Sequence, residues 1–241
     1  MKNLLITILT TIVLLTSITI AQNYSLSFDG VDDYVDLGNS ELFGLNESHP
    51  ITIMFDCKPN SYGYLVQKYQ NGNASNSDYF ISIDNVFEKY RITANGTDAV
   101  NITEPNFGVW QHITVVFESS SNNKFYKDGF FVDSAQLTYS TSISSMNLVL
   151  GVLDVNNGPY NGNIDNLQIW NYALDSTQIQ SYMSTPPTGD EQGLVGYWNF
   201  NAGEGYILND HSGNQNHGDI NGATWVENIY GCTDSLAGNF N

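Results

Sequence analysis

Basic residues are scarce in this chain. Its 241 residues include seven lysines and arginines against 25 aspartates and glutamates, which gives a formal net charge of −18. A nucleic-acid-binding protein needs a basic patch that neutralises phosphates, and too few basic residues are present to build one. Adsorption to an anionic membrane surface depends on clustered lysine and arginine in the same way. The composition therefore predicts that neither nucleic acid nor a charged lipid surface is the partner.

Cysteine is rarer still, because Cys57 and Cys232 are the two cysteines of the sequence. An exported protein could join them in a disulfide, since such bonds persist in oxidising compartments. Cys57, however, ends the apolar run 51–57, whereas Cys232 lies close to the last residue. The sequence permits this pairing, but we do not favour it.

Long hydrophobic runs occur only at the N-terminus. Lys2 precedes an apolar stretch over residues 4–20, and Ala21 completes a small-residue pattern typical of signal-peptide cleavage. The alternative interpretation is a membrane anchor, but several threonines and a serine interrupt the stretch, which is also short for a span. We therefore predict a signal peptide over residues 1–21 and no membrane span after its cleavage.

Short apolar segments separated by glycine and asparagine are abundant. They occur at 24–28, 34–37, 51–57, 79–83, 90–93, 110–117, 124–127, 130–133 and 148–151. Asp128-Gly129 joins two of these segments and is the strongest hairpin signal, because both turn positions require a positive φ. Many short strands with such turns indicate an all-β sandwich.

One short helix is expected behind the last strand of this series. Asp175 is in the N-cap position, and Gln178, three residues later, completes a capping box. Leu174 and Ile179 occupy the two positions of a hydrophobic staple across the helix start. These signals predict a helix over residues 176–183.

Five motifs occur in a fixed order along residues 24–182. They are Ser-Phe-Asp-Gly-Val-Asp-Asp-Tyr-Val at 27–35, Trp-Gln-His-Ile at 110–113, Phe-Tyr-Lys-Asp-Gly at 125–129, Leu-Gly at 150–151 and Gly-Asn-Ile-Asp-Asn-Leu-Gln-Ile-Trp-Asn-Tyr-Ala-Leu at 162–174. Together they resemble the bacterial laminin-G-like, concanavalin A-like lectin/glucanase jelly-roll family, which includes pentraxin relatives. The resemblance implies an all-β, two-sheet antiparallel jelly-roll sandwich.

The remaining boundaries follow from this resemblance. The sandwich is expected over residues 22–184, followed by a linker at 185–192 that contains two prolines and a glycine. Residues 193–228 also resemble the family, but they look like strands that usually precede its first motif. They either begin a second domain or fold back and complete the first sandwich. Because about 30 residues cannot bury a core of their own, we expect Trp198, Phe200 and Trp225 to pack onto the first sandwich.

The tail at 229–241 resembles the start of a Cys-bounded repeat of secreted proteins of Bacteroidota, although the second cysteine of that repeat is not in the sequence. The tail and the predicted signal peptide imply a protein that is secreted or displayed on the outer surface of a Bacteroidota-like bacterium.

Calcium is the cofactor that the resemblance implies. In pentraxin relatives the loop after the Leu-Gly strand holds the ion, and here that loop contains Asp154 and Asn156, although two apolar residues stand beside them where an acidic ligand is expected. A structural calcium held by Asp29, Asp32 or Asp165 is the alternative. A third interpretation requires no metal, because such carboxylates also accept hydrogen bonds from turn and backbone amides.

Four tyrosines form a candidate ligand-binding rim. Tyr62, Tyr64, Tyr69 and Tyr160 sit among glycine, asparagine and serine and are therefore expected on loops. Sugar-binding proteins use such rings as flat platforms, with asparagine and aspartate accepting hydroxyl hydrogen bonds. The alternative is that these rings only cover loop backbone.

Catalytic signals are weak. Glucanases of the family carry closely spaced carboxylates on one strand, and this chain has no Glu-x-Asp-x-Glu-like run. His112 has no serine or cysteine partner suggested by the sequence, so we interpret it as structural. His211 and His217 lie in a Gly/Asn loop without further metal ligands, which indicates a solvated loop. We predict no catalytic residue.

The sequence therefore predicts a non-catalytic module outside the cell. The first hypothesis is that it binds an extracellular carbohydrate or glycoconjugate. The second is an adhesive or structural spacer that contacts a surface protein, and the third, which we favour least, is a glycoside hydrolase or lyase. A fold resemblance does not choose between the first two, because function belongs to sites rather than folds.

Overall fold

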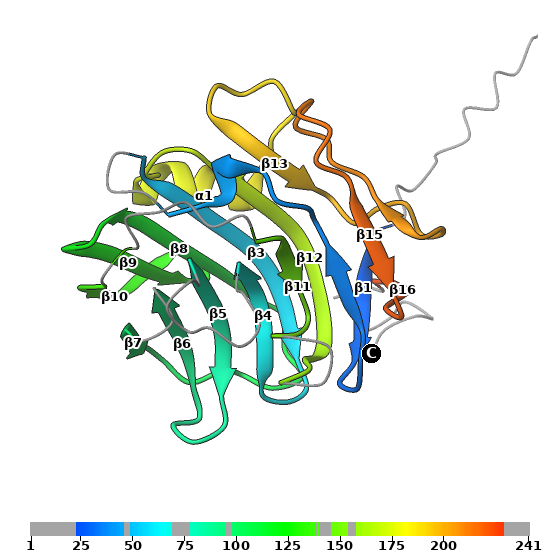
Figure 1. Ribbon diagram of the computed structural model, residues 1–241, viewed down its shortest axis with the longest axis horizontal. Coiled ribbons are helices and arrows are strands. Elements are labelled where there is room, and N and C mark those ends of the chain that lie inside the picture. Colours follow the sequence, from blue (N-terminus) through cyan, green and yellow to red (C-terminus); the bar gives the residue numbers. More distant parts are fainter. Residues whose placement is uncertain are drawn as a thin grey trace, which may run out of the picture.

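The computed structural model describes residues 23–45, 49–68, 78–94, 98–137, 139, 146–153 and 158–228. The predicted signal peptide, the tail at 229–241, Tyr69, Asp154, Asn156 and Cys232 lie outside these residues. The described chain forms two antiparallel sheets around a common core, with a short α-helix beside the first sheet (Figure 1). This arrangement confirms the predicted two-sheet sandwich with one short α-helix.

The first sheet has eight strands. In spatial order these are β10 (Phe130–Ala135), β9 (Asn122–Lys127), β8 (Gln111–Ser119), β3 (Ile51–Pro59), β12 (Asn161–Trp170), β1 (Tyr24–Asp29) and β16 (Thr224–Glu227), with β13 (Leu194–Trp198) also paired to β12. The long strand β12 has β3 along one side, whereas β1 and β13 share its other side. The hairpin predicted at Asp128-Gly129 joins β9 and β10, and both turn residues have a positive φ.

The second sheet also has eight strands. In spatial order these are β14 (Ile207–Leu208), β15 (Gly218–Asn221), β2 (Tyr34–Asp36), β11 (Leu148–Leu150), β4 (Gly63–Lys68), β5 (Tyr79–Asp84), β6 (Lys89–Ala94) and β7 (Asp98–Asn101). β4 lies in a segment that we expected to be a loop. That expectation came from the glycine and asparagine residues around its tyrosines, which interrupt the pattern of a strand. Tyr64 is therefore a strand residue, and the prediction of a loop there was wrong.

Alternation along the strands separates the core from the outer faces. On β5, Tyr79, Ile81 and Ile83 belong to the buried core, whereas Phe80 and Ser82 leave the opposite face. Trp198 on β13 is fully buried, and its ring lies against Gly196, where a Cβ atom would come within 2.3 Å of the indole. Core packing thus excludes a side chain at Gly196.

The α-helix α1 (Ser176–Ser184) begins where the sequence predicts. The Asp175 carboxylate accepts hydrogen bonds from the backbone N–H groups of Thr177 and Gln178 at 2.8 and 2.9 Å, and the Gln178 side chain accepts the N–H of Asp175 at 3.0 Å. Leu174 and Ile179 are buried in one apolar cluster on the outer face of the first sheet. A 3-10 helix, η1 (Glu41–Phe43), lies between β2 and β3. Within the described ranges, no helix has the length and apolar character needed to cross a bilayer.

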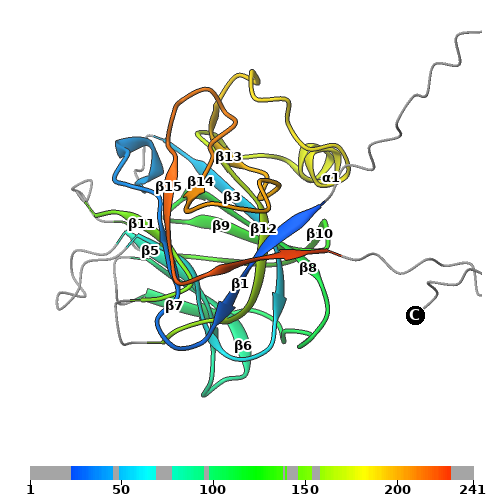
Figure 2. The ribbon, with the colours of Figure 1, turned by 90° about the vertical axis from the view of Figure 1, so that its right-hand side faces the viewer.

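Residues 194–227 contribute strands to both sheets. β13 and β16 pair with β12 and β1 of the first sheet, whereas β15 pairs with β2 of the second sheet and β14 follows outside it. Figure 2 views this edge, where the red β16 lies beside the blue β1. Phe200 is buried in the common core, and Trp225 packs against it with part of its ring exposed.

Candidate functional site

A pocket opens at the end of the second sheet where β4 begins and β5 ends. We call it the tyrosine pocket; its volume is about 340 Å³, and its lining includes Tyr62, Gly63, Tyr64, Ser82, Asp84 and Gly158. Tyr64 and Ser82 are register partners on neighbouring antiparallel strands, so both side chains leave the outer face of the sheet. Two phenol rings, a hydroxyl and a carboxylate therefore meet in one cavity.

Two glycines allow the chain to close tightly around Tyr64. Gly158 has a φ of +63°, and a Cβ atom there would lie 2.4 Å from the Tyr64 ring. Gly63 has a φ of +153°, and its Cβ atom would lie 2.7 Å from the carbonyl oxygen of Pro159. The N–H of Tyr64 also donates to the Gly158 carbonyl at 3.1 Å. The position of the Tyr64 ring thus depends on glycine at both neighbouring positions.

Both tyrosine rings are held by other aromatic rings. Tyr64 meets Phe80 edge-on, with ring centroids 5.0 Å apart, and Tyr62 meets Phe107 edge-on at 5.3 Å. Burial, followed by the charge and hydrogen bond of the Glu88 carboxylate, raises the pKa of Tyr62, which stays a neutral phenol at physiological pH. Edge-to-face pairs of this kind fix ring orientation before any ligand arrives.

Asp84 supplies the charge of the pocket. Its carboxylate accepts the backbone N–H groups of Val86 and Phe87 at 2.8 and 2.9 Å and pairs with the Arg91 guanidinium at 2.6 Å. Burial opposes the charge, but these three donors outweigh it and lower the pKa of Asp84. Asp84 is therefore an ionised acceptor whose oxygens are already partly engaged.

Polar side chains continue from the pocket across the outer face of the second sheet. The register aligns Tyr64, Ser82, Arg91 and Asn101 in one row, and Gln67, Phe80 and Thr93 in the next. Four buried atoms in these rows have no hydrogen-bond partner among the described residues: Gln67 Oε1, Arg91 Nε, Thr93 Oγ1 and Asn101 Oδ1. Buried polar atoms are nearly always paired, so this face calls for bound water or a ligand rich in hydroxyl groups.

A second cluster lies in the β1–β2 turn, where the carboxylate oxygens of Asp29, Asp32 and Asp33 come within 4.8 Å of one another. We call these three residues the aspartate group. Asp29 accepts the N–H of Val31, and Asp33 accepts the N–H of Asp29, both at 2.8 Å, so the turn already uses two of the carboxylates. Burial, opposed in part by that hydrogen bond and reinforced by the neighbouring charges, raises the pKa of Asp33. The oxygen donors suit a hard cation.

Asp165 is not part of the aspartate group. It lies on β12, beside Asp56 of β3 in the register, on the outer face of the first sheet. Its carboxylate accepts the Asn228 side chain at 3.1 Å, while burial and then the charge of Asp56 raise its pKa to about 8. His112 lies next in the same row, and its Nδ1 is 2.7 Å from Oδ1 of Asp56.

Two further predicted residues are buried in the core. Tyr160 was expected on a loop rim, but it is 0% exposed, packs against Phe28 with ring centroids 6.0 Å apart and donates to the Asn163 carbonyl at 3.2 Å. Its assignment to a ligand-binding rim was therefore wrong. Cys57 carries a free, buried thiol 3.5 Å from the Tyr90 hydroxyl, and burial raises the pKa of that thiol to about 12.

Sequence reasoning missed Ser82, Asp84 and Arg91. The signal that could have found Ser82 and Asp84 is the alternation along residues 79–84. It places their side chains on one face of the strand and those of Tyr79, Ile81 and Ile83 on the other. What the alternation could not provide was the pairing of β5 with β4, since the latter strand was not recognised.

A family model described as the concanavalin A-like lectin/glucanases superfamily matches residues 29–180 of this chain. Among curated proteins, the sushi, von Willebrand factor type A, EGF and pentraxin domain-containing protein 1 of Rattus norvegicus is 28% identical over an alignment of 164 residues that covers 62% of this chain. The chain spans 4% of the length of that relative, so the similarity concerns one small part of it.

Solved structures with a similar fold include two with a stated link to carbohydrate. A candidate carbohydrate-binding protein from Bacteroides ovatus has a TM-score of 0.66 at 14% identity, over 86% of this chain and 60% of its own. The CBM40 of the Ruminococcus gnavus IT-sialidase, bound to α2,3-sialyllactose, has a TM-score of 0.52 at 16% identity, over 66% of this chain and 96% of its own. At these identities the likeness establishes the fold.

Proposed function

The chain belongs to the concanavalin A-like lectin/glucanase superfamily, and on that premise we propose that it is a non-catalytic module that binds carbohydrate at the tyrosine pocket. One observation carries the proposal. Two oriented phenol rings, a hydroxyl and a carboxylate line one cavity, and buried polar atoms without a partner among the described residues continue from it along the same face. Aromatic surface combined with a few converging polar groups is the usual composition of a small-molecule site.

The charges favour a neutral glycan. The chain carries a net charge of −18, so an anionic saccharide would approach against a repulsive field. Arg91, a cation beside the pocket, is already paired with Asp84. A neutral ligand with many hydroxyl groups can donate to Asp84 and hydrogen-bond Ser82 without placing a second charge in the pocket.

The same chemistry argues against hydrolysis. Glycosidases generally use two carboxyl groups, one as acid and one as base or nucleophile. Asp84 is the one carboxylate among the lining residues that the structure describes, while the Glu88 carboxylate lies behind the lining Tyr62, and the lowered pKa of Asp84 is unsuited to an acid. We further propose that the module acts outside the cell, since the N-terminal segment has the features of a signal peptide.

The first test titrates the protein with neutral oligosaccharides, including arabinotriose, and with 3′-sialyllactose as the anionic comparison. Tyr64→Ala is expected to weaken binding of the best neutral ligand at least about tenfold, or about 1.4 kcal/mol, because it removes both ring surface and the phenol hydroxyl. Tyr64→Phe separates the two contributions. Isothermal titration calorimetry provides the dissociation constants.

Phe130→Ala is the matched control, because Phe130 is an exposed aromatic residue on β10 of the other sheet. It should leave the dissociation constant unchanged. Folded protein that binds none of the saccharides would count against the proposal and favour the second hypothesis, contact with a surface protein. The exposed Phe130, Phe131 and Val132 on the edge strand β10 are the observation that favours this alternative.

Calcium remains a proposal of its own, at the aspartate group. A bound ion would offset the repulsion between Asp29, Asp32 and Asp33, with water supplying the remaining oxygen ligands. Millimolar calcium is then expected to raise the melting temperature by a few degrees over protein in chelator, because the ion binds the folded state. Asp32→Asn should remove this shift, whereas Asp219→Asn, an exposed carboxylate on β15, should retain it. Equal melting temperatures in calcium and chelator would refute the site.

A further inference from the structure

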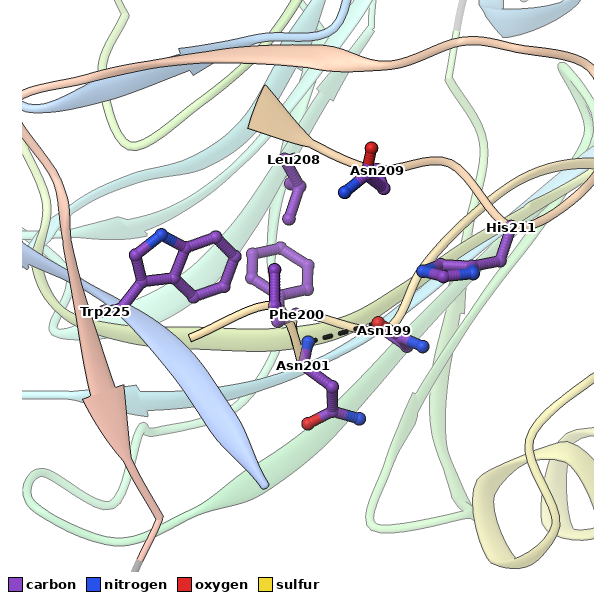
Figure 3. Close-up of a pocket in the computed structure, with 8 residues that line it drawn as sticks. Asn199, Phe200, Asn201, Leu208, Asn209, His211 and Trp225 are labelled. Atoms are coloured by element: carbon purple, nitrogen blue, oxygen red, sulfur yellow. Dashed lines mark hydrogen bonds between the residues drawn. The ribbon is translucent and has the colours of Figure 1, made fainter. Parts of the chain in front are cut away.

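A second cavity, of about 170 Å³, lies in the C-terminal segment and shares no lining residue with the tyrosine pocket (Figure 3). We call it the amide pocket. Its polar rim consists of Asn199, Asn201, Asn209 and His211. Its apolar part is formed by Phe200, Leu208 and Trp225, and in Figure 3 the indole is directed toward the Phe200 ring. The cavity thus combines an aromatic surface with three side-chain amides and an imidazole.

The apolar part is held in place by contacts that do not involve a ligand. The Trp225 indole N–H donates to the Gly205 carbonyl at 2.9 Å, so its one polar atom is engaged and the ring is fixed. Phe200 and Leu208 are buried in the common core of the sandwich. The site is therefore attached to rigid structure, and little side-chain freedom would be lost on binding.

The turn around Phe200 is strained. Phe200 has a φ of +54°, a conformation that is rare for a bulky residue. The Asn199 side chain accepts the N–H of Asn201 at 3.1 Å, and the Asn201 side chain accepts the N–H of Tyr24 at 3.0 Å. These bonds fix both amides at the rim while Phe200 enters the core, and strain of this kind is concentrated at functional sites.

Several polar groups of the rim are available to a ligand. Within the described part of the chain, the Asn209 side chain and the His211 ring make no hydrogen bond. The side chains of Asn199 and Asn201 each accept one hydrogen bond through the carbonyl oxygen. Their Nδ2 donors remain open. Among the described lining residues none is aspartate, glutamate, lysine or arginine. The pocket therefore offers donors and acceptors but no fixed charge.

We propose that the amide pocket is a second carbohydrate site that binds a single neutral pyranose ring. Amides both donate and accept, which matches neighbouring sugar hydroxyls, and the indole can cover the apolar C–H face of the ring. Phosphates, carboxylates and ammonium ligands would enter without a counter-charge. The volume lies below the roughly 300–1,000 Å³ of pockets that enclose drug-sized ligands, which favours one ring over an extended chain.

This inference rests on the proposed function for its ligand class, and it adds a consequence. A chain with two glycan sites binds a polysaccharide that reaches both sites more tightly than either site alone, because the second contact becomes intramolecular. The tyrosine pocket would then bind a longer segment, and the amide pocket a terminal or branching ring.

The experiment follows the indole N–H resonance of Trp225 by NMR, assigned through its loss in Trp225→Phe. Methyl glycosides of neutral hexoses and pentoses are the probes. We expect at least one probe to shift this resonance with saturation. Asn209→Ala and His211→Ala should each weaken that binding at least about threefold, and Gln192→Ala, which removes an exposed amide outside the pocket, should not. Asn209 and His211 are exposed, so both variants are expected to fold.

Tyr64→Ala separates the two sites. The inference is supported if this variant loses oligosaccharide binding at the tyrosine pocket but retains the Trp225 shift. Persistent Tyr64-dependent binding without any Trp225 shift would overturn the amide pocket and leave the proposed function intact. Trp225 shifts that disappear in Tyr64→Ala but survive in Asn209→Ala would also overturn it, since one site would then explain both signals. No binding of any saccharide would overturn both proposals.

Discussion

Ending the chain after Gln192 is expected to abolish cooperative folding. The truncation removes β13 from β12, β16 from β1 and β15 from β2, so both sheets lose strands on the same side of the molecule. It also removes eight buried hydrophobic residues, which are Leu194, Val195, Tyr197, Trp198, Phe200, Leu208, Ile220 and Ala223. Truncating one such side chain typically costs about 2–5 kcal/mol. A whole domain is stable by only about 5–15 kcal/mol, so the loss exceeds what the remaining sandwich can tolerate.

The measurement is near-ultraviolet circular dichroism with thermal unfolding. A chain that ends after Asn228 retains every strand that the structure describes and is the matched control, and it should unfold cooperatively. Trp198→Ala is a milder test of the same packing. It is expected to lower the free energy of unfolding by about 3–5 kcal/mol, because it removes the buried indole and its hydrogen bond to the Asn216 carbonyl. A sharp transition in the chain that ends after Gln192, within a few degrees of the control, would mean that residues 22–192 fold alone.

Asp165→Asn is expected to stabilise the protein at alkaline pH. The pKa of Asp165 is raised to about 8 by burial and by Asp56, whereas an unfolded chain would show about 3.9. Between these values the folded state holds one proton more than the unfolded state. The stability contributed by this group is therefore complete below pH 4 and is lost progressively as the pH rises to 8. The amide of the variant stays neutral throughout and resembles the protonated carboxyl group.

The expected gain in the free energy of unfolding of the variant grows from near zero at pH 4 to an upper limit of about 6 kcal/mol above pH 8. Thermal unfolding of both proteins from pH 4 to 9 measures it. Asp219→Asn is the control, because Asp219 is exposed and its substitution should shift the curve equally at every pH. A variant whose stability follows the same pH dependence as the parent protein would show that Asp165 is ionised in the folded state.

The sequence was sufficient to predict those features that depend on contacts between residues close together in the chain. The start of α1 follows from Asp175 and Gln178, whose capping bonds join groups three residues apart. The β9–β10 hairpin follows from Asp128-Gly129 for the same reason. The alternation of short apolar segments then required two sheets around one core, which the structure confirms.

The tyrosines show where local patterns fail. Tyr64 and Tyr160 have similar neighbours in sequence, yet Tyr64 lines a pocket and Tyr160 is fully buried. Burial depends on what packs against a residue, and the contacts of Tyr160 with Phe28 join segments that are far apart in the chain. Likewise, β4 was missed because its apolar residues are interrupted by tyrosine and glutamine, and pairing with β5 and β11 stabilises it as a strand.

The sequence by itself determined the fold class, the helix start and the β9–β10 turn, because hydrophobic patterning and short-range hydrogen bonding decide these features. The tertiary structure alone decided which side chains share a cavity. Ser82 lies beside Tyr64 through strand register, and Trp225 lines the same pocket as Asn199 because β16 returns to the edge beside β1. The members of each pair are too far apart in the sequence for a local pattern to join them, and packing over the whole domain brings them together.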